Sequence, residues 1–213
     1  MKRSLATLFG IALVSASVGA VSAFGQGTIV GSKHDFSSGN TNRGSYGGNS
    51  NQTCVFCHTP HAATSNTVPL WNRAFTTSSF TMYSSSTLNG TITTQPGQTS
   101  IACLSCHDGT IAVSAWGGNT GTDVVTGSTN LGTNLGNDHP VGLNTSNYPT
   151  ADPDITAPST WNLPLFGTVA SPSAQTQLEC ATCHEPHNRG AVANDFLRVT
   201  MSQSALCVRC HTK

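Results

Sequence analysis

The sequence contains few charged side chains. Of its 213 residues, 9 are Lys or Arg and 9 are Asp or Glu, which is 8 % of the chain, whereas about 25 % is usual in soluble domains. The formal net charge is zero, so there is neither the basic footprint that nucleic acid requires nor an acidic run for a cationic partner. This composition excludes nucleic-acid binding and a charged coiled coil.

Large apolar side chains are scarce as well. From Phe24 onward, Leu, Ile, Val and Phe make up about 18 % of the residues, below the roughly 20 % at which a self-sufficient core becomes doubtful. Ser, Thr, Asn and Gly together number 92. The sequence therefore predicts that less than about a third of the residues lie in regular structure. It also predicts a core made partly by something other than aliphatic side chains.

The N-terminus has the layout of a secretory signal peptide. Lys2 and Arg3 precede an apolar run of small residues from Ser4 to about Ala20, and small residues follow up to Ala23. This order of charged, apolar and small segments predicts cleavage after residue 23. An uncleaved membrane anchor is the alternative. The mature chain, residues 24–213, is expected to be exported as a single domain.

All eight cysteines fall into C-x-x-C-H motifs, the attachment signature of c-type haem. Two thiols add across the two vinyl groups of one porphyrin, and the histidine that follows lies under the iron. The sequence therefore predicts four covalently bound haems. Their attachment cysteines and proximal histidines are Cys54, Cys57 and His58; Cys103, Cys106 and His107; Cys180, Cys183 and His184; and Cys207, Cys210 and His211.

Other uses of paired cysteines account less well for this pattern. Disulfides would close strained rings across a gap of two residues, and they do not explain the histidine after every pair. Zinc ribbons do not require that histidine either. Thioredoxin-like redox pairs occur singly on a βα unit. The pattern therefore indicates a tetrahaem c-type cytochrome.

The remaining histidines predict the second axial ligand of each iron. Four histidines lie outside the motifs, and they match the four distal positions in number: His34, His61, His139 and His187. Methionine is the alternative distal ligand, but only Met82 and Met201 remain in the mature chain. We therefore expect bis-histidine ligation at all four irons.

Two of these histidines follow a motif histidine by three residues, in His58-Thr-Pro-His61 and His184-Glu-Pro-His187. A residue so close to one proximal ligand cannot easily reach the opposite face of the same porphyrin. We expect His61 and His187 to ligate neighbouring haems and to draw porphyrins together in pairs. The repeated C-x-x-C-H-x-P-H sequence suggests a duplicated two-haem unit.

The other two distal candidates lie next to aspartates, in His34-Asp35 and Asp138-His139. Either carboxylate could accept a hydrogen bond from an imidazole and increase its donor strength. The alternative is that both aspartates are turn residues.

The predicted fold is mostly irregular coil with short helices and few short strands, wrapped around a chain of four stacked haems. Porphyrin faces replace the missing aliphatic core, and the thioethers act as staples. We expect a strand at Ile111–Ala115, a hairpin within Gly117–Gly136, helices at Leu178–Cys183 and Ser202–Val208, and loops at Gly44–Asn51 and Ser84–Ser100.

Two histidines on every iron leave no coordination position for a substrate. The rest of the chain shows no nucleophile triad, phosphate loop or carboxylate pair. The sequence therefore predicts electron transfer rather than enzymatic catalysis, with low haem potentials suited to anaerobic respiration. A soluble periplasmic shuttle or an electron-transfer subunit of a reductase is the first alternative. A multihaem reductase with one open iron is the second.

The doubled C-x-x-C-H-x-P-H motifs, Lys33-His34-Asp35 and Asn137-Asp138-His139-Pro140-Val141-Gly142 resemble the tetrahaem outer-surface cytochromes of metal-reducing bacteria, the OmcE type. This resemblance implies head-to-tail polymerisation into an extracellular filament with a continuous haem chain. It further implies that one distal histidine is donated by the neighbouring protomer. His34 is the candidate, because a terminal segment exchanges easily between subunits.

The expected partners follow from the same resemblance. They are further copies of this chain, other redox proteins and extracellular electron acceptors such as metal oxides or electrodes. The expected location is the cell surface, with the periplasm as the alternative.

Overall fold

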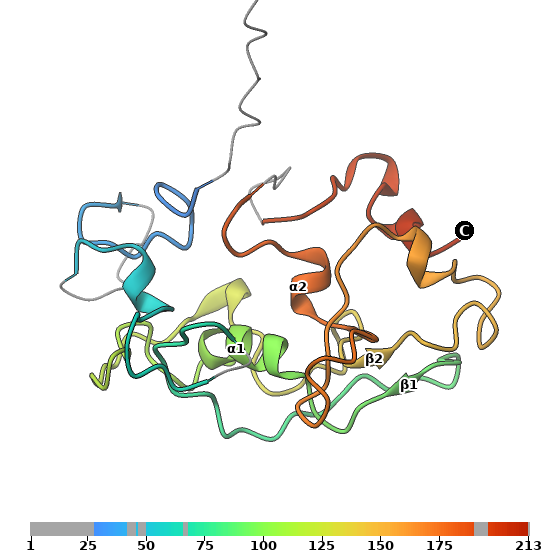
Figure 1. Ribbon diagram of the computed structural model, residues 1–213, viewed down its shortest axis with the longest axis horizontal. Coiled ribbons are helices and arrows are strands. Elements are labelled where there is room, and N and C mark those ends of the chain that lie inside the picture. The colour runs from blue at the N-terminus through green and yellow to red at the C-terminus, as the bar shows by residue number, and fades with distance from the viewer. Residues whose placement is uncertain (1–27, 42–45, 47–49, 66–67, 190–195, 213) are drawn as a thin grey trace, which may run out of the picture.

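The computed structural model describes residues 28–41, 46, 50–65, 68–189 and 196–212. The predicted signal peptide, residues 1–23, lies outside the described residues, and the loop predicted at Gly44–Asn51 is described only in part. The first described segments lie at one end of the long axis, and the C-terminus lies toward the other end (Figure 1). Between them the chain reaches β1 on the C-terminal side, returns to α1 and then runs back toward the C-terminus (Figure 1).

Regular structure is sparse, and it confirms the predicted coil-rich fold. The α-helices are α1 (Gln98–His107) and α2 (Cys180–Cys183), which pack against each other. Strands β1 (Thr91–Ile92), β2 (Leu143–Asn144) and β3 (Gln177–Leu178) form an antiparallel sheet in the order β1-β2-β3. Short 3-10 turns complete the fold: η2 (Cys54–Phe56), η3 (Gly127–Thr129), η4 (Pro158–Thr160), η5 (Ser202–Ser204) and η6 (Cys207–Arg209).

The apolar core is divided into two small clusters. One joins Leu143 and Leu178 of the sheet to Tyr148 and Trp161. The other joins Leu104 of α1 to Phe80 and Leu135. Such small clusters agree with the low content of large apolar side chains, because hydrophobic stabilisation is proportional to the apolar area that is buried.

Buried polar side chains connect the elements between these clusters. Glu179 is 1 % exposed and precedes α2, where its side chain and Thr182 form a capping box. Its carboxylate also accepts hydrogen bonds from the hydroxyl of Ser100 and the amide of Gly97, the latter at 3.0 Å. The N-termini of α1 and α2 are thereby joined through one carboxylate.

The strand predicted at Ile111–Ala115 and the hairpin predicted within Gly117–Gly136 are both wrong. Arg73 explains the first difference, because its guanidinium donates to the carbonyls of Ala112 and Val113, both at 2.6 Å. Those carbonyls are therefore not available to a strand partner. Within Gly117–Gly136 the chain forms turns and coil with the single 3-10 turn η3.

The two predicted helices are confirmed only in part. The segment Leu178–Cys183 starts as the end of β3 and turns helical at Cys180, after the capping residue. The segment Ser202–Val208 breaks into η5 and η6. Gln203 and Ser204 have φ values of 52° and 58°, a left-handed conformation that no continuous α-helix accommodates.

The loop predicted at Ser84–Ser100 contains β1 and the first residues of α1, which the sequence patterns did not indicate. Across the part of the chain that the structure describes, no helix is long and apolar enough to cross a bilayer.

Candidate haem-attachment sites

Each C-x-x-C-H motif folds into a tight helical turn. The second motif forms the end of α1. In the other three, the motif histidine's backbone amide donates to the carbonyl of the first cysteine: His58 to Cys54 at 2.8 Å, His184 to Cys180 at 3.1 Å and His211 to Cys207 at 3.0 Å. A turn of this kind brings residues three and four apart to one face. Both sulfur atoms and the imidazole can therefore meet the same porphyrin.

All eight cysteines lie within the described residues, and all are free thiols. Burial raises the pKa of Cys57 and that of Cys210 to about 12. Both thiols are therefore protonated at neutral pH. The structure therefore contains none of the disulfides that the competing interpretation of the motifs requires.

Cysteines of successive motifs influence one another. Cys57 of the first motif interacts electrostatically with Cys106 of the second. Helix α1 packs against α2, and the interaction between Cys103 and Cys180 raises the pKa of Cys103 and lowers that of Cys180, while the Cys103 thiol donates to the Thr99 carbonyl at 3.4 Å. Cys210 of the fourth motif in turn interacts with a cysteine of the third. The four motifs therefore form one row in chain order.

Three histidines outside the motifs face a motif histidine. The ring centres of His34 and His107 lie 6.1 Å apart, those of His58 and His187 5.9 Å apart, and those of His139 and His211 6.5 Å apart. Two metal–imidazole bonds of about 2 Å each, with the distance from each nitrogen to its ring centre, require about 6 Å between the ring centres. These pairs therefore fit a metal ion held between two imidazoles.

The hydrogen bonds of the rings leave one nitrogen available in each. The Nδ1 atom of His58 lies 2.8 Å from the carbonyl oxygen of Pro69, and that of His107 lies 2.7 Å from the carbonyl of Thr129. The Nδ1 atom of His139 lies 3.2 Å from the Pro140 carbonyl. Because a carbonyl oxygen only accepts, Nδ1 carries the proton and Nε2 carries the lone pair that a metal requires.

Burial keeps the imidazole rings of His34 and His139 neutral. Burial, followed by the neighbouring imidazole of His107, lowers the pKa of His34 to about 4. Burial also lowers the pKa of His139. A neutral imidazole is the form that binds iron, so both rings are already in that form at neutral pH.

Among the described residues there is no group of three or more His, Cys, Asp or Glu side chains that could enclose a metal ion. Structural zinc needs four protein ligands. A haem iron takes only two axial ligands from the protein, so paired histidines suffice for haem but not for structural zinc.

Three buried donors lie in the segments that follow the first two motifs and have no acceptor among the described residues: the indole nitrogens of Trp71 and Trp116 and Nε of Arg73. The Arg73 guanidinium is 2 % exposed, and the partners found for it are backbone carbonyls. Buried donors of this kind are rarely left without a partner. A haem carries carboxylate side chains that would satisfy them, so these residues fit the group as well.

Of the two aspartates expected beside distal ligands, Asp35 is a turn residue. Its carboxylate accepts hydrogen bonds from the Gly31 amide at 2.7 Å, the Ser37 hydroxyl at 2.6 Å and the Thr53 hydroxyl at 3.3 Å. The turn alternative is therefore confirmed for Asp35. No hydrogen bond from an imidazole to the Asp138 carboxylate occurs within the described ranges.

The carboxylate that does contact an imidazole is Glu185, which the sequence patterns did not single out. Its Oε1 lies 3.1 Å from Nδ1 of His187, and its Oε2 accepts from Arg198 at 3.0 Å. Burial alone would raise the pKa of Glu185. The hydrogen bond from the His187 backbone amide and the charge of Arg198 together outweigh burial, so the pKa lies below its ordinary value. The position of Glu185 between the two histidines of His-Glu-Pro-His was the signal from which this contact could have been predicted.

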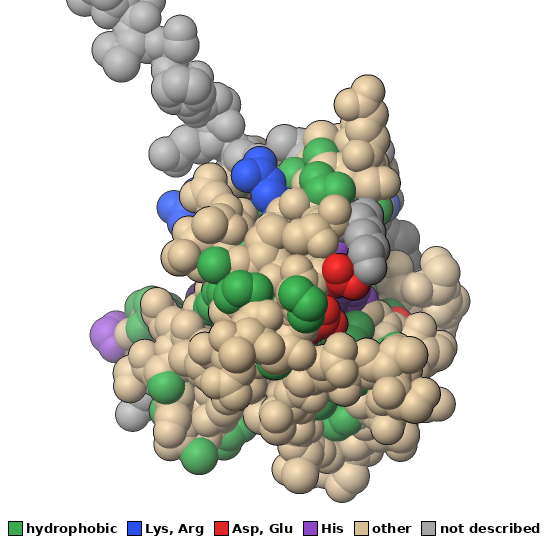
Figure 2. Space-filling view, turned by 90° about the vertical axis from the view of Figure 1, so that its right-hand side faces the viewer, with side chains coloured by type: hydrophobic (Ala, Val, Ile, Leu, Met, Phe, Trp, Pro, Cys, Tyr) green, Lys and Arg blue, Asp and Glu red, His purple; other side chains and the backbone are tan. Residues whose placement is uncertain are grey.

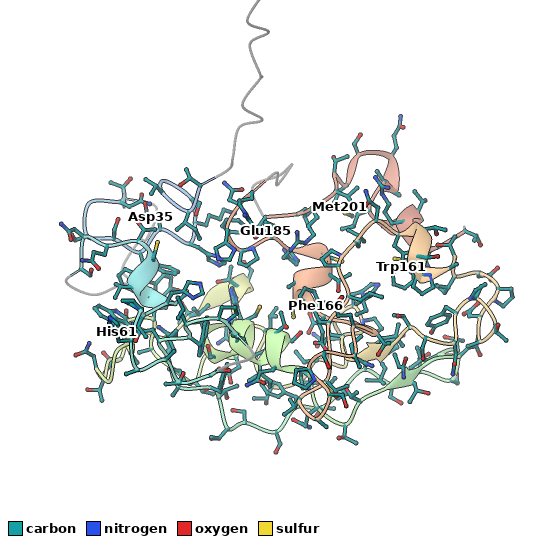
Figure 3. The ribbon with its side chains drawn as sticks, in the orientation of Figure 1. Asp35, His61, Trp161, Phe166, Glu185 and Met201 are labelled. Atoms are coloured by element: carbon teal, nitrogen blue, oxygen red, sulfur yellow. The ribbon has the colours of Figure 1, made fainter. Side chains whose placement is uncertain are left out.

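His61 differs from the other three histidines outside the motifs. Its side chain is exposed, and no imidazole ring lies opposite it among the described residues. Figure 3 shows it at the end of the molecule that carries the first motif, away from Trp161. The structure therefore brings three of the four distal candidates to a motif histidine of the same chain, and leaves His61 at the surface.

One part of the chain matches a known protein family. Residues 172–213 match the family described as "Doubled CXXCH motif (Paired_CXXCH_1)". This segment contains the third and fourth motifs, with their four cysteines and the histidine pair His184 and His187. No curated protein matches the chain. The family match supports a multihaem c-type cytochrome, and with it haem-based electron transfer.

Proposed function

We propose that this chain carries electrons through four c-type haems and is the subunit of an extracellular filament. The bound haem supplies reversible one-electron chemistry at its iron. In this proposal each motif attaches one haem through its two cysteines, and its histidine is the proximal ligand. The distal ligands would be His187 opposite His58, His34 opposite His107, and His139 opposite His211.

The observation that carries the proposal is the succession of the four motifs through the molecule. Helices α1 and α2, which carry the second and third motifs, pack against each other, and Cys57 and Cys210 interact electrostatically with cysteines of neighbouring motifs. Since each motif marks the edge of a porphyrin, this succession supports porphyrins that are closely spaced along the row. Such a row serves long-range electron transfer rather than four separate reactions.

The chain's own residues would hold the iron ligands still during this function. The hydrogen bonds that Nδ1 of His58 and Nδ1 of His107 donate to the Pro69 and Thr129 carbonyls fix the orientation of the two rings. Pairing three of the proximal histidines with a distal one would close both axial positions of those irons. A closed iron exchanges electrons but accepts no substrate, which favours a carrier over a reductase.

Several surface features support end-to-end assembly. Figure 2 shows a face on which uncharged side chains and backbone predominate and charged groups are few, so electrostatic repulsion between copies would be weak. Leu70, next to the first motif, and Val208, inside the fourth motif, are each 51 % exposed. Large apolar side chains at both ends of the row suit a heterologous contact that repeats without closing, the geometry of a fibre.

We further propose that His61, rather than His34, is the histidine donated to a neighbouring copy. The ring of His34 stacks on Phe196 at 4.5 Å and faces His107, so its donation to another molecule would break contacts within its own chain. His61 is exposed and lies at one end of the row. A surface imidazole in this position can reach the iron of an adjacent protomer at no such cost.

Electron microscopy of protein sheared from the surface of the native host tests this function, together with a pyridine haemochrome count on the same sample. The expected result is ordered filaments with four haems per chain. Four haems on compact single protomers would support the soluble shuttle and contradict the filament. Fewer than four haems, or a high-spin iron in the assembled protein, would contradict the ligation scheme.

A further inference from the structure

The imidazole of His187 has a carboxylate as its hydrogen-bond partner. The Nδ1 atom of His187 lies 3.1 Å from Oε1 of Glu185. The corresponding partners of His58, His107 and His139 are backbone carbonyl oxygens. A hydrogen bond to an ionised acceptor is roughly twice as strong as one between neutral groups. The His187 ring is therefore in a different electrostatic environment.

The Glu185 carboxylate is held firmly in this contact. Its side chain is 9 % exposed, and its second oxygen accepts from Arg198 at 3.0 Å. Arg198 is fixed in turn, because its Nε donates to the Ala181 carbonyl at 2.9 Å. The backbone amide of His187 also donates to Oε1 of Glu185 at 3.1 Å. These bonds orient the carboxylate toward the imidazole.

We propose that Glu185 is a positioning residue that fixes His187 with Nε2 toward iron and lowers the reduction potential of the haem shared by His58 and His187. This inference rests on the proposed function, because it takes His187 as the distal ligand opposite His58. The negative acceptor draws the Nδ1 proton away from the ring and makes Nε2 a stronger donor. A stronger donor stabilises the ferric over the ferrous state.

Arg198 moderates this effect. Its positive charge shares the Glu185 carboxylate with His187. Loss of Arg198 would leave the carboxylate a stronger acceptor for the imidazole. The two residues therefore act on the potential with opposite signs, which a purely structural role of the cluster would not produce.

The test uses the haem-loaded protein with the substitutions Glu185→Gln and Arg198→Gln. We expect Glu185→Gln to raise the midpoint potential of one haem by about 59 mV, a tenfold change in a one-electron equilibrium. Arg198→Gln is expected to lower it. Near-infrared magnetic circular dichroism of the ferric protein follows axial donor strength, and one of its charge-transfer components should move in opposite directions in the two variants.

Glu179→Gln is the matched control, since it neutralises another buried carboxylate whose partners are Ser100 and Gly97 rather than an imidazole. It should leave the dichroism of the ferric haems unchanged. Unchanged spectra and potentials in fully loaded Glu185→Gln protein, or shifts of the same sign in both variants, would overturn the role of Glu185. If Glu185→Gln does not take up haem, the sign of the Arg198→Gln shift decides.

This outcome is separable from that of the proposed function. The haem count and the spin state of the unsubstituted protein test the four bis-histidine sites. The variants test only how one of these sites is tuned. If the unsubstituted protein has four low-spin haems but Glu185→Gln changes neither potential nor dichroism, the proposed function stands and the role of Glu185 is wrong.

Discussion

Glu179 is a buried acid whose ionisation affects folding. Burial raises its pKa from 4.5 to about 6, although hydrogen bonds from Ser100 and Gly97 act in the opposite direction. Because the folded state binds the proton more tightly than the unfolded state, stability falls as the pH rises from about 4.5 to about 6. A shift of this size corresponds to about 2 kcal/mol.

The substitution Glu179→Gln should remove this dependence. We expect the wild-type protein to lose about 2 kcal/mol of unfolding free energy relative to the variant between pH 4 and pH 7. Urea unfolding of both haem-loaded proteins at several pH values measures the difference. A difference that stays constant with pH would show that Glu179 does not titrate in this range.

At the scale of single residues, the sequence predicted the cysteines and histidines of the C-x-x-C-H motifs, because all members of each motif are close together in the chain. The spacing of two thiols and an imidazole is contained within five consecutive residues, so the pattern alone identifies it. The partner of an imidazole depends instead on how a loop turns. Asp35 follows His34 directly but turns back to Ser37 and Gly31, whereas Glu185 reaches His187 across Pro186.

The elements of this protein begin where particular side chains fix the backbone. Helix α1 starts directly after Gly97, where the backbone lies against the Glu179 side chain and a Cβ atom would come within 2.9 Å of the carbonyl oxygen of Gly167. Helix α2 starts after the capping pair of Glu179 and Thr182. The close approach of backbone to backbone at Gly97 therefore sets the position of α1 relative to the third motif.

We expect Gly97→Ala to lower the unfolding free energy by about 1–3 kcal/mol, because the added methyl group forces the surrounding backbone apart. Urea unfolding of the haem-loaded variant measures this loss. Gly39→Ala is the control, since a Cβ atom there would meet nothing within 4 Å. Equal stabilities of the two variants would contradict the close packing inferred at Gly97.

Local propensity failed as a guide to most of these elements. Ile111–Ala115 has the composition of a strand, but the buried guanidinium of Arg73 binds its carbonyls from a segment about 40 residues earlier. No sequence window shows a contact over that separation. Helix α1 was missed for a related reason, because its buried Ser100 and Ser105 do not form an apolar stripe.

Over the whole molecule, composition was the better guide. The low content of large apolar residues predicted sparse regular structure and too few aliphatic side chains for a self-sufficient core, and the two small clusters around Trp161 and Leu104 agree with this prediction. The order of the motifs in space also follows their order in the chain. The pairing of distal histidines could not be predicted, because His187 meets a proximal histidine 129 positions earlier in the sequence.

At the same scale, His61→Ala tests the assembly. Because its ring contacts no imidazole of its own chain within the described residues, we expect the variant to retain four haems per chain and to lose filaments. Electron microscopy and a haemochrome count on the purified variant measure both. Thr120→Ala, at another exposed position, should assemble like the wild type. Normal filaments of the His61→Ala variant would contradict the proposal that His61 is a ligand donated to a neighbouring copy.

The packing of α1 against α2 has a consequence for biogenesis. It places the segments that carry Cys103 and Cys180, which belong to different motifs, against each other, and the interaction of the two thiols favours the thiolate of Cys180. A thiolate is the form of cysteine that an oxidant attacks. A disulfide between these two residues would leave neither motif with both sulfur atoms for a porphyrin. A chain that closed under oxidising conditions before its cofactors were attached would then be trapped without two of them.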